Sequence, residues 1–211
     1  MRKKALVTGA SRGIGKAVSR MLAKEGYDLL LVCRNSLNEM EALGKELTEQ
    51  YGVFCETALV DVSNPEQVQR LFKGAGEIEV LVNNAGVSHI GLLTDMTVEQ
   101  WREVIDTNLS ALFYTCKWTV PGMVRRKSGK IINISSVWGS VGASMETAYS
   151  GRRRKDAHCR GIIDLLEERR SCHRKISSLT NAIHVLLMIR ILITNSSALS
   201  TGSRIRTYLK T

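Results

Sequence analysis

The sequence predicts an α/β fold over residues 1–150, in which a doubly wound parallel sheet carries helices on both faces. Short apolar runs alternate along this part of the chain with segments of helical apolar spacing. Such alternation is typical of a parallel sheet, because crossovers between parallel strands are almost always right-handed. Glycines, amides and charged residues also follow the predicted strands where each one ends. Ligands of such sheets bind outside the carboxyl ends of the strands, so this pattern also predicts a site.

The individual elements follow in chain order from the same patterns. Strands are predicted where the apolar runs are short, at residues 5–7, 28–33, 53–60, 79–82 and 130–134. Helices are predicted where apolar residues recur at helical spacing, at residues 13–24, 37–49, 65–73 and 98–123. No internal repeat or low-complexity linker interrupts this series before Gly151. We therefore expect one domain over residues 1–150, followed by a different segment over residues 151–211.

The charge of the chain is concentrated in that second segment. The 211 residues are 44% hydrophobic and 24% charged, which is ordinary for a globular domain, but the formal net charge is +10. Residues 1–150 hold 17 Lys and Arg against 16 Asp and Glu, a net charge of +1, whereas residues 151–211 hold 13 against 4, a net charge of +9. The basic balance is thus a property of the tail, and a nucleic-acid partner is not expected.

Cysteine usage and the apolar runs indicate a cytoplasmic protein. Five cysteines, an odd number without a C-x-x-C pair, favour reduced thiols over a disulfide framework. The first apolar run is too short for a signal peptide. The longest one, residues 182–193, contains His184 and Arg190 and falls short of the roughly 20 residues that a membrane span requires. No membrane span is expected.

No metal site is expected either. The adjacent pairs His158-Cys159 and Cys172-His173 are the only residues that suggest one. Neighbouring residues of a helix point about 100° apart, and the two-residue spacing of zinc ligands is absent.

Three glycines mark the turn after the first predicted strand. The run Thr8-Gly9-Ala10-Ser11-Arg12-Gly13-Ile14-Gly15 places them between a strand and a helix. Glycines in this position allow a tight bend and a close approach of the backbone to a pyrophosphate at the helix N-terminus. A plain turn without a ligand is the alternative, which the strand before the turn and the helix after it disfavour.

Two arginines near this turn favour NADP over NAD as the cofactor. A site for NAD usually carries an acidic residue about 20 residues past the glycine turn, where it binds the ribose hydroxyls. Here the second strand ends at Arg34, and Arg12 lies inside the glycine turn. Guanidinium groups bind a 2′-phosphate that a carboxylate would repel. The alternative is that both arginines are simply solvated.

Later strand ends carry further candidates. Asn83-Asn84-Ala85-Gly86 follows the fourth predicted strand and suggests side-chain amides beside a cofactor, although an Asn-rich turn remains the alternative. Ser136 and Tyr149 are candidate hydrogen-bond donors to a substrate carbonyl oxygen. A tyrosine acts as an acid only where a nearby cation or positive field lowers its pKa from about 10.

Taken together, these residues resemble the short-chain dehydrogenase/reductase family in its single-domain, NADP-using form, over about residues 3–150. The resemblance implies a Rossmann-type sheet and hydride transfer from nicotinamide. It implies that Tyr149 donates a proton to the substrate carbonyl, that Ser136 orients this carbonyl, and that Asn108 holds a water in the proton relay. It implies adenine contact by Asp61. The cofactor-binding residues that it implies are Gly9, Ser11, Arg12, Gly13, Ile14, Gly15, Arg34, Asp61, Val62, Asn83, Asn84, Ala85 and Gly86.

Within this family the chain looks most like the 3-oxoacyl-[acyl-carrier-protein] reductases, enzymes of fatty acid biosynthesis. The segments that carry this likeness are the glycine turn with Arg12, the run Asn108-Leu109-Ser110 and the strand that leads to Ser136. The likeness implies a small-molecule or carrier-bound acyl substrate and a homo-oligomer. No metal takes part in the implied reaction.

The resemblance fails after Tyr149. The family expects Tyr-x-x-x-Lys, with the ammonium one helical turn from the phenol, but this position holds Arg153. Lys155 lies two residues further on, about 200° around a helix. A guanidinium stays protonated and has a different donor geometry, so we expect impaired turnover. Residues 151–211 also lack the Val-Asn…Pro-Gly segment that the family places over the nicotinamide.

Three interpretations of residues 151–211 remain open. A frameshifted or misjoined terminus explains the abrupt change at Gly151 together with the missing motifs. A diverged tail that mediates interactions is the second interpretation. The third is a basic arm, because Arg152-Arg153-Arg154-Lys155 is a concentrated positive cluster, although it lacks the interleaved aromatic residues of a single-strand binder. The sequence thus predicts an NADP-dependent reductase with impaired catalysis or, alternatively, an inactive NADP-binding protein or a broken reductase.

Overall fold

The computed structural model describes residues 2–136 and 147–150. All of them lie within the compact unit Met1–Leu166. The boundary that we expect after residue 150 stays a prediction, because the chain beyond it lies outside the described residues.

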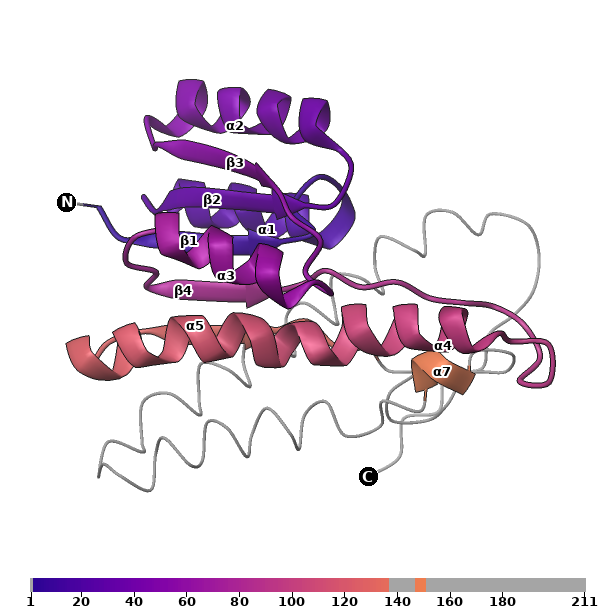
Figure 1. The fold of residues 1–211 in the computed structure, drawn as a ribbon. Coiled ribbons are helices and arrows are strands. Elements are labelled where there is room, and N and C mark those ends of the chain that lie inside the picture. Colours follow the sequence, from indigo (N-terminus) through magenta and orange to yellow (C-terminus); the bar gives the residue numbers. More distant parts are fainter. Residues whose placement is uncertain (1, 137–146, 151–211) are drawn as a thin grey trace, which may run out of the picture. The chain divides into compact units, whose positions relative to one another are not determined.

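A five-stranded parallel sheet forms the centre of the fold (Figure 1). In spatial order its strands are β3 (Cys55–Leu59), β2 (Asp28–Cys33), β1 (Lys4–Thr8), β4 (Val80–Asn83) and β5 (Lys130–Asn133). The central strand β1 pairs with β2 on one side and with β4 on the other, so that Val7 lies opposite both Leu31 and Val82. The order reverses between β1 and β4, which is the place where sheets of this kind bind ligands.

Alternation of apolar side chains along the strands builds a core on each face of the sheet. On one face, Val7 and Leu31 pack beneath α1 (Gly13–Lys24) and α2 (Leu37–Tyr51). On the opposite face, Leu6 and Leu81 pack against α3 (Pro65–Gly74) and α5 (Ala111–Arg126). Strands that are apolar on both faces are expected for a parallel sheet between two helical layers, and the fold prediction is confirmed.

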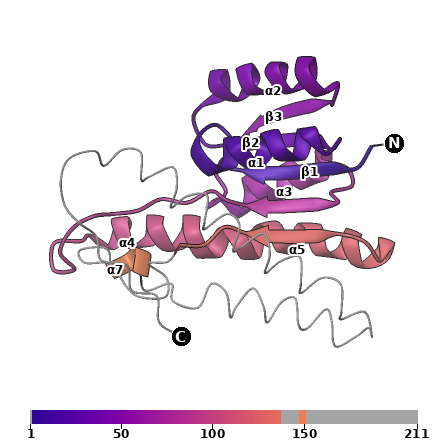
Figure 2. The same ribbon diagram turned by 180° about the vertical axis from the view of Figure 1, so that it is seen from behind.

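The helix predicted over residues 98–123 is interrupted. It consists of α4 (Val98–Ile105), a π-helical segment η1 (Asp106–Ser110) and α5, which form one continuous stretch (Figure 2). A capping box between Thr97 and Gln100 fixes where α4 begins. The short helix α7 (Thr147–Ser150) lies against α4. Single π turns inside α-helices are frequent at functional sites, and η1 contains Asn108.

The other predicted boundaries agree with the structure to within two residues, except that α5 ends at Arg126, three residues beyond the predicted residue 123. Among the strands, β3 differs most in length, since it spans Cys55–Leu59 where residues 53–60 were predicted. It lies at the edge of the sheet and pairs only with β2, so it ends where that pairing ends.

Candidate functional site

The carboxyl ends of β1 and β4 are joined by side-chain hydrogen bonds at the reversal of strand order. The hydroxyl of Thr8 accepts from the backbone N–H groups of Asn84 and Ala85, each at 3.0 Å. The side-chain Nδ2 of Asn84 donates in return to the carbonyl oxygens of Thr8, at 2.9 Å, and Gly9, at 3.1 Å. The glycine turn and the segment Asn83–Gly86 are thereby held in one place, although the bonded residues are at least 75 positions apart in sequence.

Close packing at this junction requires glycine at two positions. Gly9 has a φ of +65°, and a Cβ there would lie 2.8 Å from Nδ2 of Asn84. A Cβ on Gly15 would collide with the carbonyl oxygen of Gly9. The first and third glycines of the turn therefore serve the packing of the turn on itself and on Asn84.

The N-terminus of α1 remains available to an anion. The helix begins after Arg12, has no side chain that caps its first N–H groups and carries no acidic residue in its first turn. Such an end presents backbone donors and a positive dipole end, which favour a phosphate group. Arg12 and Gly13 are exposed there, whereas Ser11 and Ile14 are half-buried.

Arg34 lies directly after β2 and pairs with a residue of α4. Its Nη1 is 3.0 Å from Oε1 of Glu103, and both side chains are about half exposed. Arg34 thus has a carboxylate partner in addition to solvent, and its role toward a cofactor phosphate stays a prediction.

The predicted adenine contact Asp61 forms a local turn after β3. Its Oδ1 accepts from the backbone N–H of Ser63 at 2.9 Å and from the Ser63 hydroxyl at 2.6 Å. Its backbone N–H donates to the Gln67 side chain at 2.9 Å. Val62 is buried in the core against α3. The turn places the backbone of Asp61 and Val62 beyond the carboxyl end of β3.

A buried polar cluster holds Asn83 at the end of β4. Its Oδ1 accepts from the hydroxyl of Thr115 on α5 at 2.9 Å, and its Nδ2 donates to Oδ1 of Asn133 on β5 at 2.9 Å. Asn83 and Thr115 are almost wholly buried. Asn83 therefore joins β4, β5 and α5, and its side chain serves the scaffold of the site.

Asn108 links the π-helical segment to the chain that follows β4. Its Nδ2 donates to the carbonyl oxygen of Val87 at 2.7 Å, and its Oδ1 accepts from the Val87 N–H at 2.9 Å. A Cβ on Gly86 would lie 2.9 Å from the same Oδ1. The side chain of Asn108 is thus engaged with the backbone, and the water that it holds by resemblance stays a prediction.

Ser136 and Tyr149 lie at the end of the described chain. Ser136 is half-buried three residues after the end of β5, and Tyr149 is half-buried on α7, which lies against α4. Asn108 belongs to η1, which continues α4 directly. Arg153 and Lys155 lie outside the described residues, so the expected loss of the lysine contact stays a prediction.

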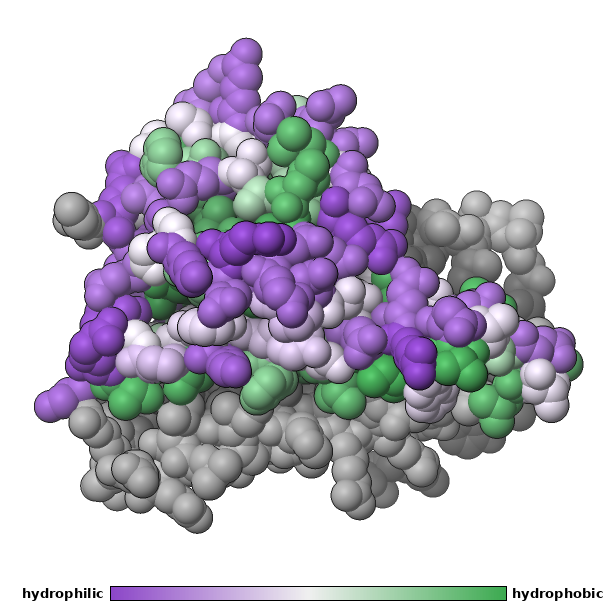
Figure 3. Space-filling view, viewed as in Figure 1, coloured by the Kyte–Doolittle hydropathy of each residue, from purple (hydrophilic) through white to green (hydrophobic). Residues whose placement is uncertain are grey.

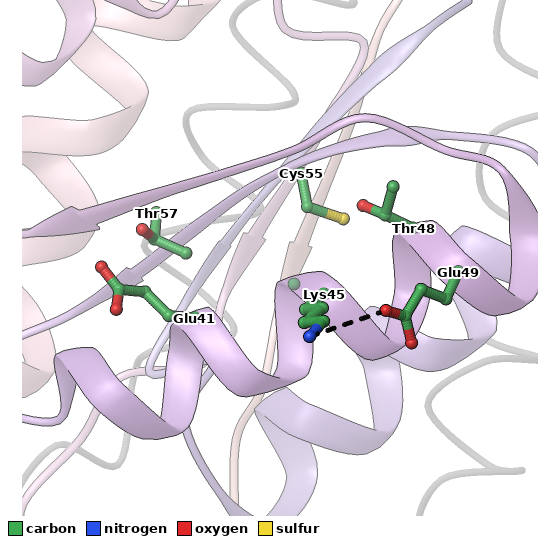
Figure 4. Close-up of a pocket in the computed structure, with 7 residues that line it drawn as sticks. Glu41, Lys45, Thr48, Glu49, Cys55 and Thr57 are labelled. Carbon is green, nitrogen blue, oxygen red and sulfur yellow. Dashed lines mark ion pairs between the residues drawn. The ribbon is translucent and has the colours of Figure 1, made fainter.

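A separate shallow pocket of about 370 Å³ lies between α2 and β3 (Figure 4). Cys55 and Thr57 line it from β3, and Lys45 and Glu49 from α2, where these two charges are 3.9 Å apart. Burial raises the pKa of the Cys55 thiol, with a smaller opposing effect of its hydrogen bond to Thr48. The pocket adjoins the first half of β3, away from the strand ends that carry the predicted site.

Two expected absences concern the described part of the chain. Within residues 2–136 and 147–150, no three His, Cys, Asp or Glu side chains cluster as a metal site would require. No helix among these residues is both long and apolar enough to cross a membrane. The His-Cys pairs at 158–159 and 172–173 lie outside them.

The glycine turn, the Asn83–Gly86 segment and Asn108 thus lie together at the carboxyl edge of the sheet, and residues 3–153 match the short chain dehydrogenase family. The chain belongs to this family. Its relatives include the uncharacterized oxidoreductase YmfI of Bacillus subtilis (strain 168), which is 38% identical over 151 residues. The 3-oxoacyl-[acyl-carrier-protein] reductase FabG of Staphylococcus aureus (strain Mu50) is 40% identical over 153 residues. Each match covers 71% of this chain but 62% of the relative's length.

Solved structures of oxidoreductases have a similar fold. A metagenomic short-chain oxidoreductase in complex with NADP is 31% identical, with a TM-score of 0.75 over 79% of this chain and 77% of that one. The L-sorbose reductase from Gluconobacter frateurii, complexed with NADPH and L-sorbose, is 28% identical, with a TM-score of 0.72 over 77% and 65% of the two chains. Both the fold class and the family resemblance are confirmed.

Sequence reasoning missed several residues that hold the predicted site residues in place. Thr115 and Asn133 hold Asn83, and Glu103 pairs with Arg34. The only signal for Thr115 and Asn133 is that they are polar within segments that are otherwise largely apolar. Glu103 carries no signal, because a charged residue on an amphipathic helix is ordinary.

Proposed function

We propose that this chain binds NADP(H) at the carboxyl ends of β1, β2 and β4 and reduces a carbonyl group to a hydroxyl. The observation that carries the proposal is the glycine turn packed on Asn84, with an uncapped α1 N-terminus beside it. Such a turn fits the pyrophosphate of a dinucleotide. Arg34 and Arg12 supply guanidinium groups for the 2′-phosphate, and two structural relatives are complexes with NADP or NADPH.

When bound, the nicotinamide supplies the hydride. The chain's own residues then have three roles. Tyr149 donates the proton to the carbonyl oxygen, Ser136 orients that oxygen by a hydrogen bond, and Asn108 holds a water through which a proton returns to the Tyr149 phenolate. Asp61 and Val62 contact the adenine at the end of β3.

The proposed substrate is a 3-oxoacyl thioester, free or attached to a carrier. Support comes from the reductase FabG of Staphylococcus aureus, with which the chain shares 40% identity over 153 residues. Reduction of 3-oxoacyl thioesters is the activity of the whole FabG protein, and the match to this chain covers 62% of the length of FabG. A cytoplasmic location and a place in fatty acid biosynthesis belong to the same proposal.

A homo-oligomer is also part of the proposal. Phe113 and Val124 on α5 and Val98 and Trp101 on α4 are apolar and exposed by 40% or more of their surface. Apolar side chains are visible along this part of the molecule in Figure 3. We take these side chains as the candidate contact surface, since exposed apolar patches mark protein contacts.

A second function is favoured by Arg153, which stands where the family expects a lysine. A chain with this change binds NADP(H) but turns over slowly or not at all, and then serves in binding or interaction. A frameshifted reductase would carry the same change. Re-reading the encoding DNA in the other two frames downstream of codon 150 distinguishes these origins: a lysine four residues after Tyr149 together with a Val-Asn…Pro-Gly segment establishes a frameshift.

The test of the main proposal is a cofactor titration followed by a turnover assay. The purified chain is titrated with NADPH and NADH by tryptophan fluorescence, and NADPH oxidation is then followed with an acetoacetyl thioester. Tighter binding of NADPH together with turnover supports the reductase. Binding without turnover supports the second function. A chain that binds neither nucleotide overturns both.

A further inference from the structure

The ion pair between Arg34 and Glu103 spans the region where the adenosine end of a dinucleotide is proposed to bind. Arg34 follows β2, whereas Glu103 belongs to α4, which follows β4. In the sheet, β1 with its glycine turn lies between β2 and β4. The contact of 3.0 Å between Nη1 and Oε1 therefore connects the two sides of the glycine turn.

While this contact is present, Glu103 engages one side of the Arg34 guanidinium. Arg34 and Glu103 are 44% and 52% exposed, so solvent and ligands reach both groups. A phosphate that binds Arg34 through two parallel N–H donors requires one edge of the guanidinium. Because Glu103 engages Nη1, such a phosphate either displaces the carboxylate or binds the edge formed by Nε and Nη2, where the carboxylate lies close enough to repel it.

We propose that Glu103 competes with the 2′-phosphate of NADP(H) for Arg34 and thereby sets how strongly this chain prefers NADP over NAD. The proposal rests on the proposed function, because it requires a dinucleotide at this site. In this proposal Glu103 contacts neither the nicotinamide nor the substrate, and it acts on cofactor binding through Arg34. It is a specificity-determining residue that weakens the binding of one cofactor only.

The expected effect is modest because the pair is exposed. Surface ion pairs contribute little net free energy, and salt screens the repulsion between a carboxylate and a phosphate at the same arginine. A 2′-phosphate carries up to about two negative charges near neutral pH, which makes it more sensitive to Glu103 than a 2′-hydroxyl. Removal of the carboxylate is therefore expected to tighten binding of the phosphorylated cofactor by about three- to ten-fold.

The test compares Glu103→Gln with the wild-type chain by calorimetric titration. The ligands are two matched pairs, NADPH with NADH and 2′,5′-ADP with AMP, each at low and high ionic strength. The matched control is Glu46→Gln, which removes the same charge from another half-exposed arginine pair, Arg20 with Glu46 at 2.8 Å between α1 and α2. A third variant, Arg34→Met, removes the guanidinium itself.

In the expected result, Glu103→Gln binds NADPH and 2′,5′-ADP about three to ten times more tightly, and the gain shrinks in high salt. Its affinities for NADH and AMP, and every affinity of the control, stay within about two-fold of the wild type. Unchanged or weaker NADPH binding by Glu103→Gln overturns the inference. If Arg34→Met loses the preference for NADPH while Glu103→Gln has no effect, the inference alone fails. If the wild type binds neither nucleotide, the proposed function fails with it.

Discussion

The side-chain amide of Asn108 forms both of its hydrogen bonds with the backbone of one residue, Val87. It donates to the carbonyl oxygen at 2.7 Å and accepts from the N–H at 2.9 Å. Because Asn108 belongs to the π-helical segment and Val87 follows β4, this pair fixes the position of the irregular turn above the sheet. The π-helical segment of the long helix is thus bonded to the chain that follows β4, next to the predicted site.

Asn108→Ala is expected to destabilise the fold. It removes two hydrogen bonds and leaves the N–H and C=O groups of Val87 without these partners, at a cost of about 2–3 kcal/mol. Urea unfolding followed by circular dichroism measures the free energy. The control is Asn38→Ala, an exposed asparagine of α2, which should change it by less than about 0.5 kcal/mol. Equal stability of the two variants would contradict this role of Asn108.

Gly15→Ala is expected to disrupt the glycine turn, because its Cβ would collide with the carbonyl oxygen of Gly9. We expect a loss of about 1–3 kcal/mol in unfolding free energy and weaker binding of NADPH. Gly74→Ala is the matched control, since a Cβ at the end of α3 meets no atom within 4 Å. Thermal unfolding and nucleotide titration of both variants check the prediction, and tolerance of Gly15→Ala with unchanged NADPH affinity would refute it.

Arg153→Lys is expected to raise turnover. It returns an ammonium to the position four residues after Tyr149, where the family resemblance places it beside the phenol. One acid–base component typically contributes about 10²–10⁴ in rate, so kcat for an acetoacetyl thioester should rise within this range. Arg154→Lys makes the same change one residue further on and should have little effect. No gain from Arg153→Lys would mean that more than this contact is missing.

Protonation of Glu79 should lower the unfolding free energy of the fold as the pH falls. Burial alone would raise the pKa of this carboxyl, but hydrogen bonds from Ser128, at 2.6 Å, and Lys3, at 3.0 Å, hold the pKa below its ordinary value. A carboxyl with a lowered folded-state pKa stabilises the fold above its unfolded pKa, about 4.3, and this stabilisation is lost as the pH falls through the folded value.

Glu79→Gln should therefore lose part of the acid sensitivity of the wild type. The measurement is the unfolding free energy at neutral pH and at successive points below about pH 5. At neutral pH the variant should be less stable by about 0.5–1 kcal/mol, and this difference should shrink as the pH falls. A difference that is the same at every pH would show that Glu79 does not titrate in this way.

Phe113→Glu is expected to weaken self-association. The ring is 55% exposed on α5, so a charge there does little to the core but opposes apolar contact with a second copy. Light scattering across a range of concentrations should show a smaller mean mass than for the wild type, with unchanged circular dichroism. Phe54→Glu changes an equally exposed ring before β3 and should leave the mass unchanged. A wild-type chain that is monomeric throughout would refute the proposed oligomer.

Much of the fold could be predicted from the sequence, because strands, helices and turns are indicated by the residues within each segment. Apolar runs such as Leu29–Leu31 on β2 are buried on both faces, and the glycine turn lies between a strand and a helix as predicted. The residues at strand ends were predictable as a set, since parallel strands bring their carboxyl ends to one edge. For this reason the Asn83–Gly86 segment lies against the glycine turn as expected.

Only the tertiary structure decided which side chains hold this edge together. The bonds of Thr8 with Asn84, of Asn83 with Thr115 and of Arg34 with Glu103 each join residues more than 30 positions apart. No periodicity reports such contacts, since they depend on how strands and helices pack. The π turn at Asn108 was not predicted either. Its backbone hydrogen bonds join residues five apart in sequence, where those of an α-helix join residues four apart, and the apolar pattern does not report this difference. Sequence thus predicted that the glycine turn and the Asn83–Gly86 segment meet at one edge of the sheet, and packing determined the partners of their side chains.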